Sequence, residues 1–117
     1  MSNYLGLDIS LNSTGYAIIN DQLDLLGFGF FDYPVLTEKN KTLVYHEKTN
    51  LQLAEIKKLI GLINIEEVFI ERFSFGSFGS SNAVSVIAEV TGAIKLYLYN
   101  ISKPYHTIAP LSVKKHI

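Results

Sequence analysis

The order of strand and helix patterns along the chain is the feature that most constrains its fold. Three strands are expected first, at residues 4–10, 14–19 and 25–31. In the first of them Leu5, Leu7 and Ile9 alternate with small or polar residues, a pattern typical of a strand with one buried face. The polar residues 20–22 supply turn chemistry between the second and third strands. We expect these three strands to form an antiparallel meander.

Helical and strand patterns alternate in the rest of the chain. The expected elements are a helix at about 42–64, a strand at 67–73, a helix from 81 or 82 to about 99, a strand at 104–109 and a helix at 111–117. Pro110 stands in the first turn of that last helix, where proline is tolerated. The sequence therefore predicts an α/β fold with a mixed five-stranded sheet, three antiparallel strands followed by a βαβα order, flanked by helices.

Composition narrows the class of protein. A chain of 117 residues fits one domain, 1–117, and 48% hydrophobic against 18% charged residues favours a packed globule over disorder. The absence of cysteine excludes disulfides and thiolate metal sites. Ten basic residues against eleven acidic ones give a net charge of −1, so the chain lacks the strongly basic footprint of many DNA-binding proteins. Any contact with DNA would have to come from a local patch.

Neither end of the chain indicates a membrane or an exported protein. No apolar run approaches the roughly 20 residues that span a bilayer, and the N-terminus lacks a signal-peptide pattern. We therefore expect a cytoplasmic protein with no membrane partner.

The last expected helix, at 111–117, has only a few residues and would be marginally stable alone, so we expect the chain to be truncated within it.

Two carboxylates lie within apolar strand patterns. Asp8 stands between Leu7 and Ile9, and Glu71 follows Ile70 in the fourth expected strand. An unpaired buried carboxylate is costly, and a bound cation is one remedy. If the two strands are neighbours, both carboxylates reach one end of the sheet and suit Mg²⁺ or Mn²⁺. The alternative for Glu71 is an ion pair with a Lys or Arg at the strand end.

Five short segments carry motif-like patterns in a fixed order along the chain. They are LGLDIS at 5–10, STGYAII at 13–19, VFIERFSFG at 68–76, AEVTGAI at 88–94 and IAPLSVKK at 108–115. The small residues Gly6 and 13–15 around Asp8 would let a backbone or a phosphate approach closely. In these segments the chain resembles the RuvC-like Holliday junction resolvases of the RNase H-like superfamily, most of all their bacteriophage members.

The resemblance implies an RNase H-like fold and a metal-dependent endodeoxyribonuclease that resolves four-way DNA junctions by paired symmetric nicks. In that family four carboxylates hold two divalent cations, which activate water and stabilise the leaving oxygen. Asp8 and Glu71 would be the first two ligands and the catalytic carboxylates. The family's other acidic pair lies in the helix that begins here at Pro110, and this sequence has no Asp or Glu from Pro110 to Ile117. The site is then half built, and the activity of this chain alone would be reduced. The implied setting is the cytoplasm of a bacterium or of a phage-infected host cell.

Branched DNA is the partner that the resemblance implies. Phe75 and Phe78 lie in a Gly- and Ser-rich loop and could stack on bases of an opened junction, unless they fold back onto the core. Basic and polar side chains near them could meet phosphates, although solvated lysines are the common alternative. The candidate DNA contacts are Arg72, Phe75, Phe78, Ser80, Lys103, Lys114 and Lys115. His46, His106 and His116 lack ligand spacing and are interpreted as structural or surface residues.

The expected helix at 82–99 carries more apolar residues than one sheet face needs, including Val84, Val86, Val90 and Leu96. Part of it could therefore form a two-fold interface in a homodimer, as the resemblance implies. A helix buried within one domain would give the same pattern.

Two other functions fit parts of the sequence. Residues 6–8 and 13–15 also resemble the phosphate-binding hairpin of the actin and sugar-kinase superfamily, although 117 residues cannot supply its two lobes and only a fragment would fit. A non-catalytic DNA-binding or scaffold module that keeps the RNase H-like fold would explain the missing acidic pair.

Overall fold

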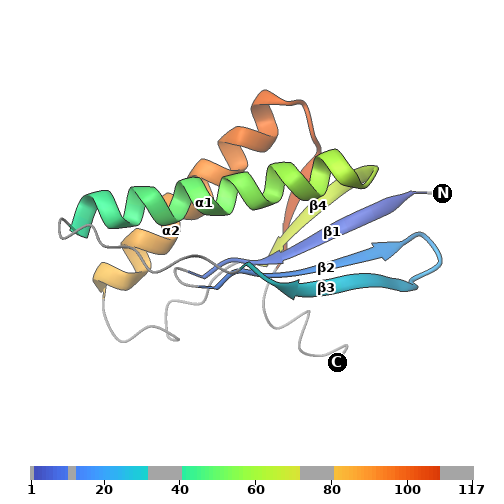
Figure 1. Ribbon diagram of the computed structural model, residues 1–117, viewed down its shortest axis with the longest axis horizontal. Helices are drawn as coiled ribbons and strands as arrows, with labels where there is room; N and C mark the ends of the chain where they lie inside the picture. The colour runs from blue at the N-terminus through green and yellow to red at the C-terminus, as the bar shows by residue number, and fades with distance from the viewer. Residues whose placement is uncertain (1, 11–12, 32–40, 72–80, 109–117) are drawn as a thin grey trace.

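The computed structural model describes residues 2–10, 13–31, 41–71 and 81–108, and five strands and two helices lie in that part of the chain. In chain order the elements are β1 Asn3–Asp8, β2 Gly15–Asn20, β3 Leu25–Phe30, α1 Lys41–Leu62, β4 Ile65–Glu71, α2 Ser81–Asn100 and β5 Tyr105–Ile108. The strands form one sheet in the order β3-β2-β1-β4-β5 (Figure 1). The predicted α/β class and the five-stranded mixed sheet are confirmed. The last helix expected, at 111–117, lies outside the described residues.

Strand β1 is the centre of the sheet and joins its two halves. It pairs antiparallel with β2, which pairs antiparallel with β3, so the predicted meander is confirmed. On its other side β1 pairs in parallel with β4, and β4 pairs in parallel with β5. The first and fourth strands are therefore neighbours, which the argument for a shared carboxylate site required.

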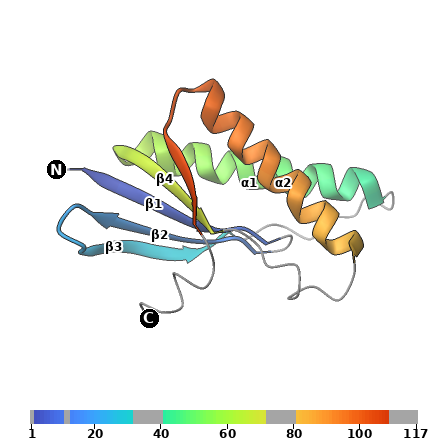
Figure 2. The same cartoon turned by 180° about the vertical axis from the view of Figure 1, so that it is seen from behind.

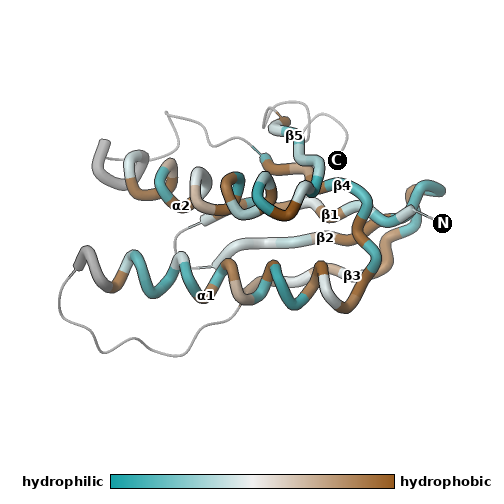
Figure 3. The backbone as a smooth tube through the Cα atoms, turned by 90° about the horizontal axis from the view of Figure 1, so that it is seen from above, coloured by the Kyte–Doolittle hydropathy of each residue, from teal (hydrophilic) through white to brown (hydrophobic). Residues whose placement is uncertain are grey.

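Both helices lie on the same face of the sheet (Figures 1 and 2). In the view from above, α1 and α2 run side by side, roughly along the direction of the strands, each with apolar turns interleaved with polar ones (Figure 3). The core lies between the helices and the sheet, because the strand residues that alternate toward the helices are buried there. Its members are Leu5, Leu7, Ile9, Ile18, Phe31, Ile56, Ile65, Val68, Ile70, Val90, Ile94 and Leu98.

The predicted turn at residues 20–22 joins β2 to β3 and is closed by the side chain of Asn20. Asn20 is buried, and its Oδ1 accepts hydrogen bonds from the backbone N–H groups of Gln22 at 2.9 Å and Asp24 at 3.0 Å. This side-chain mimic of a backbone turn closes the hairpin locally. Leu23 takes a positive φ of 66° within it and is left largely exposed.

The sheet face opposite the helices carries the residues that alternate with the core. On β3, Phe28 and Phe30 remain 72% and 71% exposed, although an apolar alternation predicts burial. Their strand is at the edge of the sheet, and no described element covers their side. The exposed face is where the candidate carboxylates lie.

Candidate metal and nucleic-acid site

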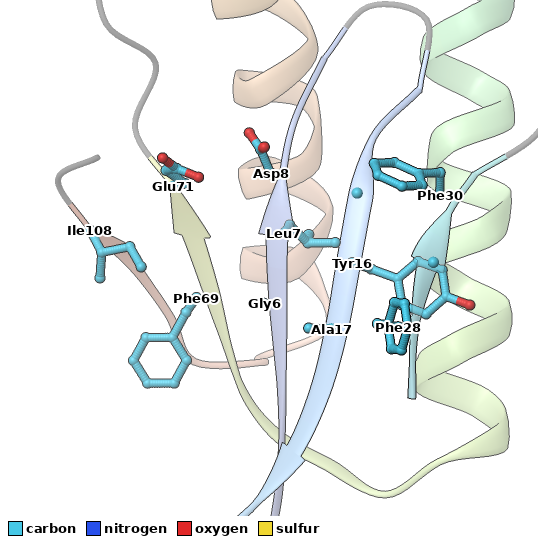
Figure 4. A pocket seen from close by; sticks show the side chains of 12 residues that line it. Gly6, Leu7, Asp8, Tyr16, Ala17, Phe28, Phe30, Phe69, Glu71 and Ile108 are labelled. Carbon is cyan, nitrogen blue, oxygen red and sulfur yellow. The ribbon is translucent and has the colours of Figure 1, made fainter. Parts of the chain in front are cut away.

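Asp8 and Glu71 lie at the same end of the sheet. Each is the last residue of its strand, β1 and β4, and these strands are parallel neighbours with Leu7 opposite Ile70. Since Leu7 and Ile70 face the helices, the residues that follow them both face the open side. Figure 4 shows the two carboxylates at the tips of adjacent strands, as the sequence analysis expected.

The carboxylates stand at one end of a shallow groove on the open face. Its floor consists of small residues on β1 and β2: Gly6, Gly15 and Ala17. Aromatic side chains flank this floor, Phe69 on one side and Phe28 with Phe30 on the other (Figure 4). The groove encloses about 320 Å³.

Asp8 and Gly15 both differ from what the sequence predicts. Asp8 is exposed, so the cost of a buried charge does not by itself require a cation beside it. Gly15 does allow a close approach, but to a protein ring: a Cβ on Gly15 would lie 3.2 Å from Cε1 of Phe30. The case for a metal site rests instead on the shared position of two carboxylates at one end of the sheet.

His106 belongs to a small cluster on the open face that the sequence did not reveal. Its ring stacks on Phe69 with centroids 5.1 Å apart, and its Nε2 lies 3.1 Å from Oε1 of Glu67. Tyr4 meets Phe69 edge-on at 6.2 Å. His106 itself is exposed, which agrees with its interpretation as a surface residue, whereas Tyr4, Glu67 and Phe69 are half-buried.

Of the seven candidate DNA contacts, only Lys103 falls within the described residues. Arg72, Phe75, Phe78, Ser80, Lys114 and Lys115 lie outside them. Lys103 donates a hydrogen bond from Nζ to the backbone oxygen of Ile65 at 2.7 Å. Ile65 begins β4 and Glu71 ends it, so the bonded end lies about 20 Å from the carboxylates at 3.3 Å per residue. The structure therefore does not bring Lys103 to the candidate site.

Replacing Lys103 with methionine tests this placement. We expect the free energy of unfolding to fall by about 1 kcal/mol, because the Ile65 carbonyl loses a charged donor. Binding of four-way junction DNA should stay within a factor of two of the unchanged chain. Urea unfolding and a gel-shift titration measure the two quantities. A large loss of DNA affinity with unchanged stability would restore Lys103 as a DNA contact.

The donor set fits a hard divalent cation only in part. Among the described residues, no group of three or more His, Asp or Glu gathers where it could hold a metal ion. Two carboxylates are nevertheless a usual protein contribution to a Mg²⁺ site, since this ion keeps several waters and takes substrate phosphates as further ligands. Asp8 and Glu71 therefore supply the type of donor that one such ion takes, with water or a phosphate as further ligands.

Comparisons with solved structures identify the fold. The chain is similar to Thermus thermophilus RuvC in complex with a Holliday junction substrate, with a TM-score of 0.77 and 14% identity, over 98% of this chain and 69% of that one. A second Thermus thermophilus RuvC structure gives 0.71 and 15%, over 97% and 67%. The chain has an RNase H-like fold. The yeast mitochondrial Holliday junction resolvase Ydc2 shares it at a TM-score of 0.65 and 14% identity, over 97% of this chain and 53% of that one.

These likenesses are structural. No protein-family model matches the sequence, and no curated protein sequence matches it. The RNase H-like fold agrees with the resemblance found in the motifs, whereas the special similarity to bacteriophage members stays a prediction. Within the described part of the chain, neither helix is both long and apolar enough to cross a membrane.

Proposed function

We propose that this chain is the catalytic domain of a metal-dependent endodeoxyribonuclease that resolves four-way DNA junctions by paired symmetric nicks. The observation that supports this most directly is the pair Asp8 and Glu71, side by side at the ends of parallel strands in an RNase H-like sheet. Solved structures with the same fold include a RuvC bound to a Holliday junction substrate and the yeast Holliday junction resolvase Ydc2.

In this proposal Asp8 and Glu71 are the catalytic carboxylates and the metal ligands. They would hold Mg²⁺ or Mn²⁺, which supplies an activated water and stabilises charge on the leaving oxygen when bound. The exposure of Asp8 leaves room for a phosphate beside it, and the neighbouring groove offers aromatic surfaces to a nucleotide. A second cation would require further acidic residues that the described part of the chain does not place here.

The contacts with branched DNA are proposed from the residues that flank β4 and β5. Arg72, Phe75, Phe78 and Ser80 lie within the nine residues that follow Glu71 in the sequence. Lys114 and Lys115 follow β5, whose last residue Ile108 pairs with Glu71. We propose that these side chains meet phosphates and unstacked bases at the junction.

We also propose a homodimer through α2, although this helix exposes fewer apolar side chains than its sequence pattern predicts. Most of the Val, Ile and Leu side chains described in this helix are buried within the protomer, namely Val86, Ile87, Val90, Ile94 and Leu98. Among the large apolar side chains of α2 that the structure describes, Leu96 and Tyr99 are left for a partner, 60% and 71% exposed, with the exposed Gly92 one turn before Leu96. An isologous contact along this face would place two sites for paired nicks.

Two alternatives remain, and each predicts a different result. A scaffold module would bind branched DNA without cutting it. A fragment of an actin- or sugar-kinase-like protein would show no preference for DNA junctions.

The test is a native gel with a labelled four-way junction, Ca²⁺ in place of Mg²⁺, and excess linear duplex as competitor. Ca²⁺ occupies oxygen-ligand sites while suppressing cleavage, so binding is observed alone. We expect a junction complex that persists at a hundredfold mass excess of duplex. Equal competition by the duplex, or no complex, would contradict junction recognition and favour the kinase-like alternative.

A further inference from the structure

The loop that follows Asp8 is held by a buried side chain of helix α1. Gln52 and Thr14 are both 0% exposed. The Gln52 amide donates from Nε2 to the backbone oxygen of Ser10 at 2.8 Å, and its Oε1 accepts from Oγ1 of Thr14 at 2.6 Å. Oγ1 of Thr14 also accepts from the backbone N–H of Ser10 at 3.2 Å. One amide therefore binds both ends of the loop.

A buried amide at this position is costly unless it is fully paired. Each buried polar group left without a partner costs about 1–3 kcal/mol, whereas an apolar side chain facing the core would need no partner. Satisfied buried networks fix one arrangement of the groups they join. Gln52 therefore specifies where Ser10 and Thr14 lie relative to α1, besides filling space.

The network surrounds the point where Asp8 leaves the sheet. Asp8 lies two residues before Ser10 and pairs with Gly15, which directly follows Thr14. Thr14 also accepts a hydrogen bond from the backbone N–H of Phe31 at 2.9 Å, which ties the end of β3 to the same loop. Gln52 of α1 therefore anchors, from the helix side of the sheet, both the end of β1 and the start of β2.

We propose that Gln52 is a positioning residue: through Ser10 and Thr14 it holds the end of β1 so that the Asp8 carboxylate stays beside Glu71. This role rests on the proposed metal site and deepens it. Gln52 lies on the helix face of the sheet while Asp8 faces the open side, so Gln52 acts through the backbone and contacts neither metal nor DNA. Mutating a residue that holds a metal ligand in place typically lowers metal affinity by 10–100-fold. Since Gln52 acts one step further out, through the backbone, we expect an effect at the lower end of this range.

The test measures the Mn²⁺ affinity of the Gln52→Met and Ile56→Val variants in titrations monitored by electron paramagnetic resonance. Methionine keeps the length of the side chain and removes both hydrogen bonds. Ile56 is also 0% exposed and lies one turn further along α1, so its variant lowers stability without touching the network. We expect Mn²⁺ affinity to fall about tenfold in Gln52→Met and to change less than twofold in Ile56→Val.

Thr14 offers a second route if Gln52→Met folds poorly. Thr14→Val should also lower Mn²⁺ affinity about tenfold, and Thr14→Ser, which keeps the hydroxyl, should restore it. Equal affinities in the Gln52, Thr14→Val and Ile56 variants, at equal stability, would overturn the proposal.

Amide hydrogen exchange without metal separates this proposal from the proposed function. In Gln52→Met, exchange at Ser10 and Phe31 should accelerate at least tenfold more than in Ile56→Val, since both amides bond to Thr14. If the unchanged chain binds no Mn²⁺, the proposed metal site is wrong. Faster exchange confined to Ser10 and Phe31 would then still support the anchoring of β1 by Gln52. Uniform acceleration across the sheet would show that Gln52 contributes only to the core, and would overturn the positioning role.

Discussion

For the proposed nuclease reaction, replacing Asp8 with asparagine is expected to lower the rate of nicking of a four-way junction in Mg²⁺ by at least about 100-fold, or about 2.7 kcal/mol of transition-state stabilisation. Asparagine has nearly the same shape but lacks the charge that a hard cation requires. Because Asp8 is exposed on the open face, the substitution should leave stability nearly unchanged. Single-turnover cleavage of a labelled junction, with Mg²⁺ varied, measures the rate.

Glu71→Gln should show the same loss, because the two carboxylates end adjacent parallel strands. Matched controls come from acidic residues away from this end of the sheet: Asp21→Asn in the β2–β3 turn and Glu66→Gln near the start of β4, both exposed. These controls should cut within a factor of two of the unchanged chain. Chelation of Mg²⁺ with EDTA should stop cleavage in all of them.

The same assay distinguishes the competing functions. If the unchanged chain binds junctions in Ca²⁺ but never nicks them in Mg²⁺ or Mn²⁺, the scaffold alternative replaces the nuclease. Undiminished cleavage by Asp8→Asn would contradict the assignment of the metal site itself. A loss restricted to Mg²⁺, with partial recovery in Mn²⁺, would agree with a carboxylate that acts by coordination.

The placement of the carboxylates could be predicted from the sequence because it depends on strand alternation and strand order. Leu5 and Leu7 facing the core force Asp8 to the opposite face, and Val68 and Ile70 do the same for Glu71. The order of elements made β1 and β4 credible neighbours. The local patterns fix the face on which each carboxylate lies, whereas the pairing of β1 with β4 was only a condition in the sequence and is supplied by the sheet order.

Gln52 and Lys103 could not be predicted, because their roles depend on partners about 40 residues away in the chain. A glutamine among helical apolar residues has the same local pattern whether it is solvated or bonds a distant loop. For Phe28 and Phe30 the local pattern was misleading, because their alternation predicts burial. They are exposed because β3 is at the edge of the sheet and both helices cover the opposite face. Such facts arise only when the elements are assembled.

The second large effect is expected in the core, at Ile94 in α2. Ile94→Ala should lower the free energy of unfolding by about 2–5 kcal/mol, because the side chain is 0% exposed and its removal loses both apolar burial and packing. Leu96→Ala, two residues further along the same helix, should cost no more than about 0.5 kcal/mol in the monomer because Leu96 is 60% exposed. Urea unfolding at low protein concentration measures both.

Repeating these measurements at high protein concentration also tests the proposed dimer. A partner seated on the exposed face of α2 would bury Leu96, so the stability lost in Leu96→Ala should then increase with concentration while the loss in Ile94→Ala stays the same. Sedimentation of the two variants gives an independent check, since Leu96→Ala should dissociate the dimer. A concentration-independent result for Leu96→Ala, with unchanged sedimentation, would place the two-fold contact elsewhere. Paired nicking would then require the two sites to be brought together by the four-way junction itself.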